Sequence, residues 1–292
     1  METNDYAIEL RDVSYYYDKD TPTEKLALSH INYGFRKGKI TGIMGHTGSG
    51  KSTLAMLLNG LSECKFGKVL HNGKDIWENK KEIGKLRFEV GLVFQYPEYQ
   101  LFEETVKADI GFGPKNMNRT PEQIDKAVRE AADFVGLSEE LFDRSPFDLS
   151  GGQKRRVAIA GVLAMEPDTL ILDEPAAGLD PGGREEILSG LVRYNKEKNA
   201  TVIIISHSME DMAKYCDDLI VLKDGELKLS GTVGEVFAHH DELVSWGLNV
   251  PQITDIAKML SDMGIPDMDG VYNVEDAAKR ILSKGGMCQC IQ

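Results

Sequence analysis

Residues 45–52, GHTGSGKS, place three glycines, a lysine and a serine at the spacing G-x-x-x-x-G-K-[ST]. Glycines at these positions allow a tight turn whose backbone N–H groups point at phosphate oxygens, and a following helix adds its positive N-terminus. In this pattern Lys51 reaches the β- and γ-phosphates of a nucleotide, and Ser52 ligates Mg²⁺. The pattern predicts a phosphate-binding P-loop made of Gly45, His46, Thr47, Gly48, Ser49, Gly50, Lys51, Ser52 and Thr53.

Two adjacent carboxylates end the apolar stretch TLILDEP, residues 169–175. Beside a P-loop, Asp173 is suited to hold the Mg²⁺ shell. Glu174 comes one residue later, where a side chain can orient or deprotonate an attacking water molecule. A strand that ends in Asp-Glu is also an ordinary strand end, and the P-loop upstream is what favours the catalytic interpretation.

Gln95 and His207 each follow a short apolar run, GLVF and TVIIIS. Sheets of alternating strands and helices bind their ligands beyond the carboxyl ends of the strands, so both side chains are expected there. Gln95 can then touch a metal-bound water and the helical segment that follows it. Taken alone, each is a weak signal, because a single histidine more often has a structural role.

A second glycine-rich loop, DLSGGQKRR at residues 148–156, precedes the apolar helical stretch VAIAGVLA. Its backbone N–H groups at the start of a helix are suited to hold a phosphate. One nucleotide needs only one P-loop, however, and this loop belongs to a segment that cannot easily reach the P-loop of the same chain. The sequence therefore raises the question of which phosphate it holds.

The elements that position these residues alternate between strand and helix, which predicts an α/β fold with a mixed, largely parallel sheet around a P-loop NTPase core. Residues 97–165 are expected to form an inserted helical subdomain, and Asp224-Gly225 to turn a hairpin. The predicted domains are a nucleotide-binding domain over 1–240 and a small helical extension over 241–292, whose two stretches have helical periodicity.

The chain has 292 residues and a net charge of −13, which argues against nucleic acid or anionic lipid as the main partner. No apolar run reaches the length of a membrane-spanning helix, and the N-terminus lacks the pattern of a signal peptide. Four scattered cysteines suit a reducing cytosol; they are Cys64, Cys216, Cys288 and Cys290. The last two, in the sequence CQC, do not complete a tetrahedral metal site.

The order of these motifs over residues 6–238 resembles the ATP-binding subunits of ABC transporters. The resemblance implies an ATP hydrolase with Glu174 as general base and His207 as the switch histidine on the γ-phosphate. It also implies that Tyr17, rather than Tyr15 or Tyr16, stacks on adenine. The remaining implied nucleotide-binding residues are Asp180 of the D-loop and the signature residues Ser150, Gly151, Gly152 and Gln153, which serve the ATP of a partner subunit. Gln95 is implied as a Q-loop residue beside the metal.

A narrower resemblance links VFQYPEYQLFEETVKADIGFGPKN, residues 93–116, to the ATPases of energy-coupling-factor importers. The stretch AAGLDPGGR, residues 176–184, resembles the second ATPase of the pair more than the first. It implies ATP and Mg²⁺ as cofactors and a second ATPase subunit, identical or related, as partner. It further implies a transmembrane coupling subunit, a substrate-binding membrane component, and a peripheral position on the cytoplasmic face of the membrane. The cargo would be vitamins or transition-metal ions, and the extension would contribute to dimer contact.

Three alternatives remain from the sequence: the ATPase of another type of ABC transporter, a soluble ABC ATPase acting on DNA or ribosomes, and a regulatory cassette that binds ATP without hydrolysis. The second usually carries a long coiled coil or two cassettes in one chain, which this sequence lacks. The intact Glu174 and His207 argue against the third. Acidic side chains are expected to meet basic residues of a membrane partner; they are Glu98, Glu103, Glu104 and Asp109.

Overall fold

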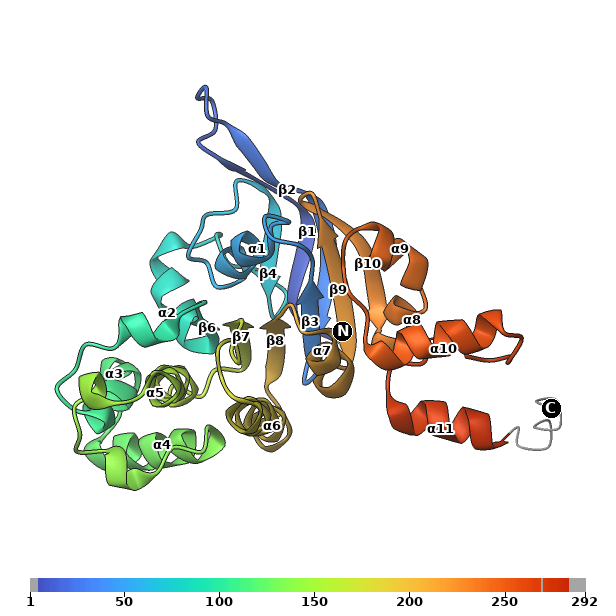
Figure 1. The fold of residues 1–292 in the computed structure, drawn as a ribbon. Coiled ribbons are helices and arrows are strands. Elements are labelled where there is room, and N and C mark those ends of the chain that lie inside the picture. The colour runs from blue at the N-terminus through green and yellow to red at the C-terminus, as the bar shows by residue number, and fades with distance from the viewer. Residues whose placement is uncertain (1–4, 269, 284–292) are drawn as a thin grey trace.

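The computed structural model describes residues 5–268 and 270–283. Its centre is a six-stranded sheet in the order β10-β9-β3-β8-β7-β6 (Figure 1). In chain order the strands are β3 (Ile40–Met44), β6 (Val90–Val93), β7 (Thr169–Asp173), β8 (Thr201–Ile205), β9 (Asp218–Lys223) and β10 (Glu226–Thr232). All neighbours are parallel except β9 and β10, so the predicted mixed, largely parallel sheet is confirmed.

The central strands are buried on both faces, as expected for parallel strands covered by helices. Every residue of β3, β7 and β8 is buried. Alternate residues face opposite cores, so that Leu170 and Leu172 pack in one apolar cluster while Ile171 packs in the other. The β9–β10 hairpin turns at Asp224 and Gly225 with positive φ angles of 51° and 79°, as the sequence predicts.

A second, four-stranded antiparallel sheet lies against the first, and the sequence did not reveal it as a separate layer. Its order is β2-β1-β4-β5, with β1 (Tyr6–Tyr17), β2 (Lys25–Arg36), β4 (Phe66–His71) and β5 (Lys74–Asp75). Helix α1 (Lys51–Leu58) joins the same apolar cluster as this sheet, because Leu54, Leu57 and Leu58 pack with Ile8 and Val13. The β1–β2 hairpin extends beyond the body of the molecule (Figure 1).

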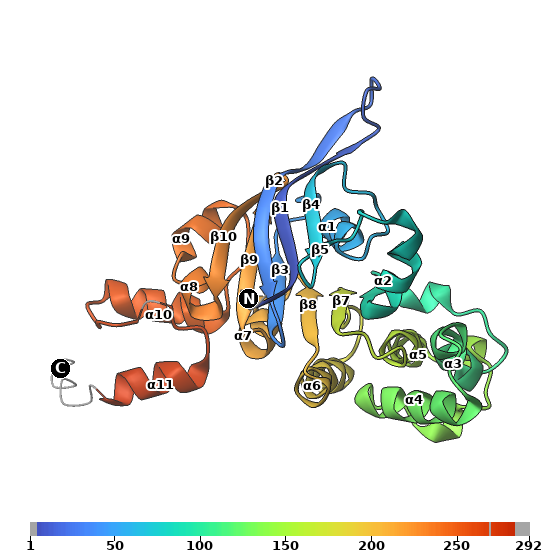
Figure 2. The same ribbon diagram turned by 180° about the vertical axis from the view of Figure 1, so that it is seen from behind.

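Between β6 and β7 the described chain contains helices and no strand. They are η2 (Pro97–Gln100), α3 (Val106–Asn116), α4 (Pro121–Phe134), η3 (Glu139–Leu141), η4 (Pro146–Asp148) and α5 (Gly151–Leu163). Helices α3, α4 and α5 gather at one end of the molecule, beyond β7 (Figure 2), and α5 contacts β6. Thr120 and Ser150 start α4 and α5 with complete capping boxes.

The other helices are η1 (Lys80–Glu82), α2 (Ile83–Glu89), α6 (Pro181–Lys198), α7 (Met209–Tyr215), α8 (Val233–Phe237), α9 (His240–Ser245), α10 (Gln252–Asp262) and α11 (Val274–Ser283). Of these, α6 and α7 cover one face of the central sheet, where Leu191 and Met212 pack in the same apolar cluster as Leu172. Helices α8 to α11 lie beyond β10, at the opposite end of the molecule from α3, α4 and α5 (Figure 1). None of the helices in the described ranges is long and apolar enough to cross a bilayer.

The two predicted C-terminal helices, α10 and α11, share a small apolar cluster with the segment that joins them. Ala257 and Ala277 are buried in it, and Ile253 and Leu260 pack against it. Ile256 on α10 is 49% exposed and Met263, which follows the helix, is 76% exposed, so both side chains point to solvent. The cysteines of the CQC sequence lie outside the described residues.

Candidate nucleotide-binding site

The P-loop lies between β3 and α1, as a strand–loop–helix unit requires. Gly45, Gly48 and Gly50 have φ angles of 151°, 84° and 104°. At Gly45 an added Cβ would lie 2.3 Å from the carbonyl oxygen of Leu222, and at Gly50 it would lie 2.7 Å from that of Ala27. Glycine is therefore required at both positions by backbone conformation and by space.

The Lys51 side chain folds back over the loop that precedes it. Its Nζ atom donates hydrogen bonds to the carbonyl oxygens of Gly45 at 2.6 Å and His46 at 3.0 Å. Burial lowers the pKa of Lys51, and the nearby carboxylates of Asp173 and Glu174 oppose that shift. The ammonium is thus held at the loop by carbonyl oxygens, facing the space that the glycines leave open.

Asp173, at the end of β7, meets the start of α1. The Ser52 hydroxyl donates a hydrogen bond of 2.7 Å to the Asp173 carboxylate, which is 8% exposed. Gln95, just beyond β6, lines the same pocket. Hydroxyl, carboxylate and amide oxygens are the ligands that Mg²⁺ prefers, so this set of donors fits the metal that the sequence predicts.

Glu174 and His207 lie together beyond the ends of β7 and β8. Their nearest side-chain atoms, Oε1 and Nε2, are 3.6 Å apart. Glu174 has a φ of 52°, which is strained for a residue other than glycine, and its Oε1 atom is buried without a hydrogen-bond partner among the described residues. Burial and the Asp173 charge raise the pKa of Glu174, whereas burial and Lys51 lower the pKa of His207. A carboxylate of raised pKa beside a pocket is suited to accept a proton.

These side chains share one pocket of about 310 Å³. It is lined by Tyr17, Lys25, Ala27, Thr47, Gly48, Gly50, Lys51, Ser52, Thr53, Gln95, Asp173, Glu174 and His207. Of the three consecutive tyrosines only Tyr17 lines it, and the Tyr17 hydroxyl lies 2.9 Å from the Thr53 hydroxyl. Lys25 and Ala27 were missed at the sequence level, because only the register of β1 and β2 brings them opposite Tyr17 and its neighbours.

The structure leaves several predicted residues outside this pocket. They are Gly45, His46, Ser49, Ser150, Gly151, Gly152, Gln153 and Asp180. The first three belong to the loop itself, and the His46 ring faces Asp224, 3.7 Å away. Ser150 and Gln153 cap the N-terminus of α5 through reciprocal hydrogen bonds of 3.0 and 3.3 Å. Asp180 caps α6 through the N–H of Gly183, at 3.1 Å.

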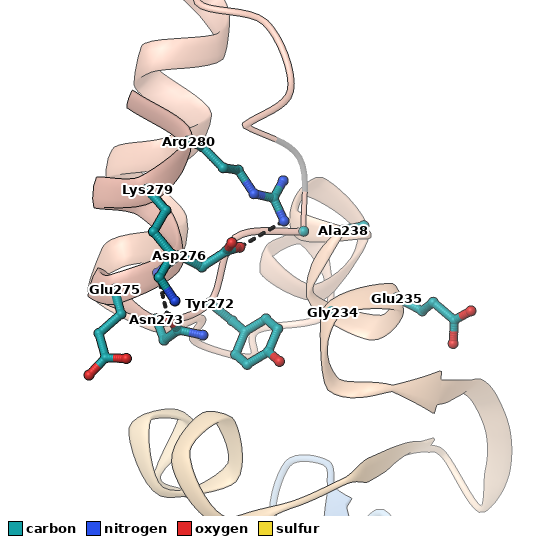
Figure 3. Close-up of a pocket in the computed structure, with 10 residues that line it drawn as sticks. Gly234, Glu235, Ala238, Tyr272, Asn273, Glu275, Asp276, Lys279 and Arg280 are labelled. Atoms are coloured by element: carbon teal, nitrogen blue, oxygen red, sulfur yellow. Dashed lines mark hydrogen bonds and ion pairs between the residues drawn. The ribbon is translucent and has the colours of Figure 1, made fainter. Parts of the chain in front are cut away.

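A larger cavity, of about 580 Å³, lies between α8 and α11 and shares no lining residue with the nucleotide pocket. Figure 3 shows Tyr272 between the two helices and the Arg280 guanidinium turned toward Asp276, at 2.7 Å. The Asn273 side chain accepts a hydrogen bond from the Asp276 N–H and so caps α11. The residues that line this cavity carry charges of both signs, and none of them forms a glycine-rich phosphate-binding loop.

The geometry defines a P-loop ATPase that carries a second, separate glycine loop at a helix start. The family model described as ABC transporter matches residues 28–177. The energy-coupling factor transporter ATP-binding protein EcfA2 of Caldanaerobacter subterraneus subsp. tengcongensis is 50% identical over 94% of this chain and 96% of its own. The protein of the same name from Bacillus subtilis is 47% identical over 89% of this chain and 96% of its own.

Solved structures agree with these relatives. The structure of cbiO1 from Clostridium perfringens, part of the ABC transporter complex cbiONQ, is 41% identical with a TM-score of 0.74, covering 87% of this chain and 99% of that one. The dimeric bacterial ABC transporter cassette MJ0796 is 29% identical with a TM-score of 0.70, covering 77% and 98%. The chain therefore belongs to the ABC transporter family and, within it, to the energy-coupling factor transporter ATP-binding proteins. The predicted fold class, family and enzyme class, an ABC-type ATPase, are confirmed.

Proposed function

We propose that this chain binds ATP with Mg²⁺ and hydrolyses it to drive import of vitamins or transition-metal ions by an energy-coupling factor transporter. The observation that carries the proposal is the convergence of Lys51, Asp173, Glu174 and His207 in one pocket. In this proposal Lys51 and the P-loop N–H groups bind the phosphates, and Tyr17 stacks on adenine. Glu174 takes the proton of the attacking water, and His207 contacts the γ-phosphate.

Mg²⁺ is assigned to Ser52, Asp173 and Gln95. The support is the 2.7 Å contact between the Ser52 hydroxyl and the Asp173 carboxylate, with the Gln95 amide in the same pocket. The ion would neutralise phosphate charge during transfer. It would also screen Asp173 from the phosphates, which this buried carboxylate otherwise repels.

The signature residues 149–153 are assigned to the ATP of a second ATPase subunit, identical or related. The support is that they line no part of the pocket of their own chain, while Ser150 and Gly151 are exposed at the start of the 13-residue helix α5. A relative solved as a dimer has the same fold. Asp180 is assigned to the same shared interface.

The membrane arrangement is also a proposal. The chain would bind the cytoplasmic side of a transmembrane coupling subunit, beside a substrate-binding component, and no nucleic acid. Of the four acidic side chains expected to meet that partner, two are engaged inside the chain. Glu98 pairs with Arg155, and Asp109 accepts the backbone N–H groups of Phe102 and Glu103. The acidic side chains proposed to contact the transmembrane partner are therefore Glu103 and Glu104.

The domain boundaries are proposed as residues 1–240 for the ATP-binding domain and 241–292 for the extension, with the helical subdomain over about 97–165. The extension would contribute to contact with the second ATPase. Its support is the apolar surface left on α10, where Ile256, Met259 and Met263 are 49%, 64% and 76% exposed.

The substitution Glu174→Gln tests the catalytic assignment. It should leave the Kd for ATP within about twofold and lower kcat by about a hundredfold or more, because the general base is lost while the phosphate contacts remain. ATP turnover and equilibrium ATP binding are the measurements. Glu210→Gln, an exposed glutamate at the start of α7, is the matched control. Equal, measurable turnover of Glu174→Gln and wild type would show that Glu174 is not the general base, and no turnover by either protein would support a regulatory cassette.

A further inference from the structure

Arg155 is a buried arginine whose role the motifs do not explain. It lies in the second turn of α5, five residues after Ser150, and is 4% exposed. Burying a guanidinium is costly unless its charge and its N–H groups find partners. The partners of Arg155 therefore indicate what the residue does.

Those partners come from two segments on either side of α5. On one side, Nε and Nη2 of Arg155 contact the two carboxylate oxygens of Glu98 in η2, at 3.2 and 3.3 Å. On the other side, Nη1 donates to the carbonyl oxygen of Ala177 and lies 3.5 Å from that of Glu174. One planar, bidentate cation thus joins the segment that follows Gln95 to the segment that carries Glu174.

The second segment is a strained turn. Glu174 has a φ of 52°, and the turn closes through a hydrogen bond of 3.2 Å from the Ala177 N–H to the Glu174 carbonyl. A second bond, from the Glu174 N–H to the carbonyl of Ile205 at 2.9 Å, holds the other side. A non-glycine residue keeps such a conformation only where its surroundings over-determine it. Arg155 contacts carbonyl oxygens at both ends of this turn.

We propose that Arg155 is the positioning residue that keeps the Glu174–Ala177 turn in its strained conformation and makes that conformation depend on Glu98. Movement of η2 (Pro97–Gln100) then displaces the guanidinium and relaxes the turn, so the Glu174 side chain leaves its working position. The part of this inference in which a membrane partner moves η2 rests on the proposed function. The link between Glu98, Arg155 and Glu174 is a property of this chain alone.

The experiment measures kcat, the Kd for ATP and the thermal midpoint on the full-length chain for Arg155→Met, Arg155→Lys, Glu98→Gln and the double variant. Arg155→Met should lower kcat about tenfold or more with the Kd for ATP within about twofold, because a displaced general base affects chemistry and not binding. Arg155→Lys should recover part of kcat. Glu98→Gln should lower kcat by about threefold, and the double variant should be no slower than Arg155→Met, because both changes break one link.

Arg119→Met is the matched control. Arg119 also contacts two carbonyl oxygens, of Ala164 and Met165, and a glutamate, Glu166, but at the far end of α5. The kcat of the Arg119→Met variant should stay within about twofold of wild type. An unchanged kcat in Arg155→Met, or additive losses in the double variant, would overturn the inference. If Arg155→Met does not fold, an unchanged kcat in Glu98→Gln overturns it equally. Absence of turnover in the wild-type chain assayed together with its second ATPase subunit would contradict the proposed function instead.

Discussion

At the scale of single residues, the nucleotide pocket contains a lysine, Lys25, that belongs to none of the sequence motifs. Lys25 is the register partner of Tyr17 across β1 and β2, and both residues line the nucleotide pocket. Directly opposed residues of an antiparallel pair lie on the same face of the sheet. Tyr17 also lies 2.9 Å from Thr53, at the P-loop end of α1. Lys25 is therefore suited to meet the phosphate nearest the nucleoside.

Lys25→Gln should weaken the binding of ATP and of ADP by a similar factor, about three- to tenfold, because both nucleotides carry the phosphate nearest the nucleoside. KM for ATP should rise accordingly with kcat unchanged. Isothermal titration with both nucleotides and steady-state turnover check this. Lys19→Gln, at the tip of the same hairpin, is the control. A loss confined to ATP would place Lys25 at the γ-phosphate and contradict the assignment.

Residue identity could be predicted where chemistry fixes both type and spacing. The P-loop, Asp173, Glu174 and His207 were found from the sequence because phosphate, metal and proton transfer each restrict the side chain. Lys25 and Arg155 were not found, because their roles arise from strand register and from the packing of α5 against η2. A surface lysine and a helical arginine have the same appearance in a sequence whether or not they line a site.

At the scale of elements, the capping box of α5 gives the signature loop a fixed geometry before any partner binds. Ser150→Arg removes that cap and fills the surface above the helix start. It should leave ATP binding to the single chain within about twofold and abolish hydrolysis, because the phosphate contact made to the partner is lost. Thr120→Arg, in the equivalent capping box of α4, is the control. Both lose about 1 kcal/mol of helix capping, so normal turnover in Ser150→Arg would count against the shared site.

Helices α9 and α10 are joined by His240, which lies between two carboxylates. Its Nδ1 is 2.9 Å from Asp241 and its Nε2 is 2.8 Å from Asp255. A neutral imidazole has one N–H, so both bonds require the protonated ring. The bond to Asp255 contributes most to raising the pKa of His240, and burial opposes the shift. The surrounding cavity also has Glu242 on the acidic side and His239 and Lys258 on the basic side.

This arrangement predicts a pH-dependent stability. Because the folded-state pKa of His240 is raised, its contribution is complete below the unfolded pKa of about 6.5 and is lost as pH rises through the folded value. His240→Gln should lower the thermal midpoint by about 2 °C near pH 6 and by less near pH 8. A constant difference across the pH range would contradict the prediction.

Element type was predictable where periodicity was strong, as in α4, α5 and the central parallel strands. The division of the first strands between two sheets was not, because β1, β2 and β3 have similar apolar content and differ only in what they pair with. Helical periodicity in the sequence predicted that α10 and α11 each have an apolar face. Ile256 on α10 nevertheless stays 49% exposed, because periodicity identifies an apolar face without specifying how much of it is buried.

At the scale of the whole molecule, the net charge is −13, and among the described residues the Glu103 and Glu104 carboxylates beside η2 form no ion pair. Reversing both, Glu103→Lys with Glu104→Lys, should separate ATP turnover from transport in the assembled complex, because the attraction to basic partner residues becomes repulsion. Turnover and substrate uptake measured on the same membranes check this. Reversal of Glu139 and Glu140, in η3 and outside residues 97–104, is the control. Full coupling in the first variant would contradict the assignment.

The separation of the two glycine loops predicts how ATP hydrolysis behaves in dimers that combine two different variants. In the proposed arrangement, a pair built from one chain with Ser150→Arg and one with Glu174→Gln contains two composite sites, of which only one is damaged. In one site both lesions meet, and in the other site neither is present. Two inactive chains thus complement each other, whereas either chain paired with itself has two damaged sites. Recovery of ATP turnover on mixing the two variants therefore indicates a site shared between two subunits, whereas no recovery indicates two independent sites.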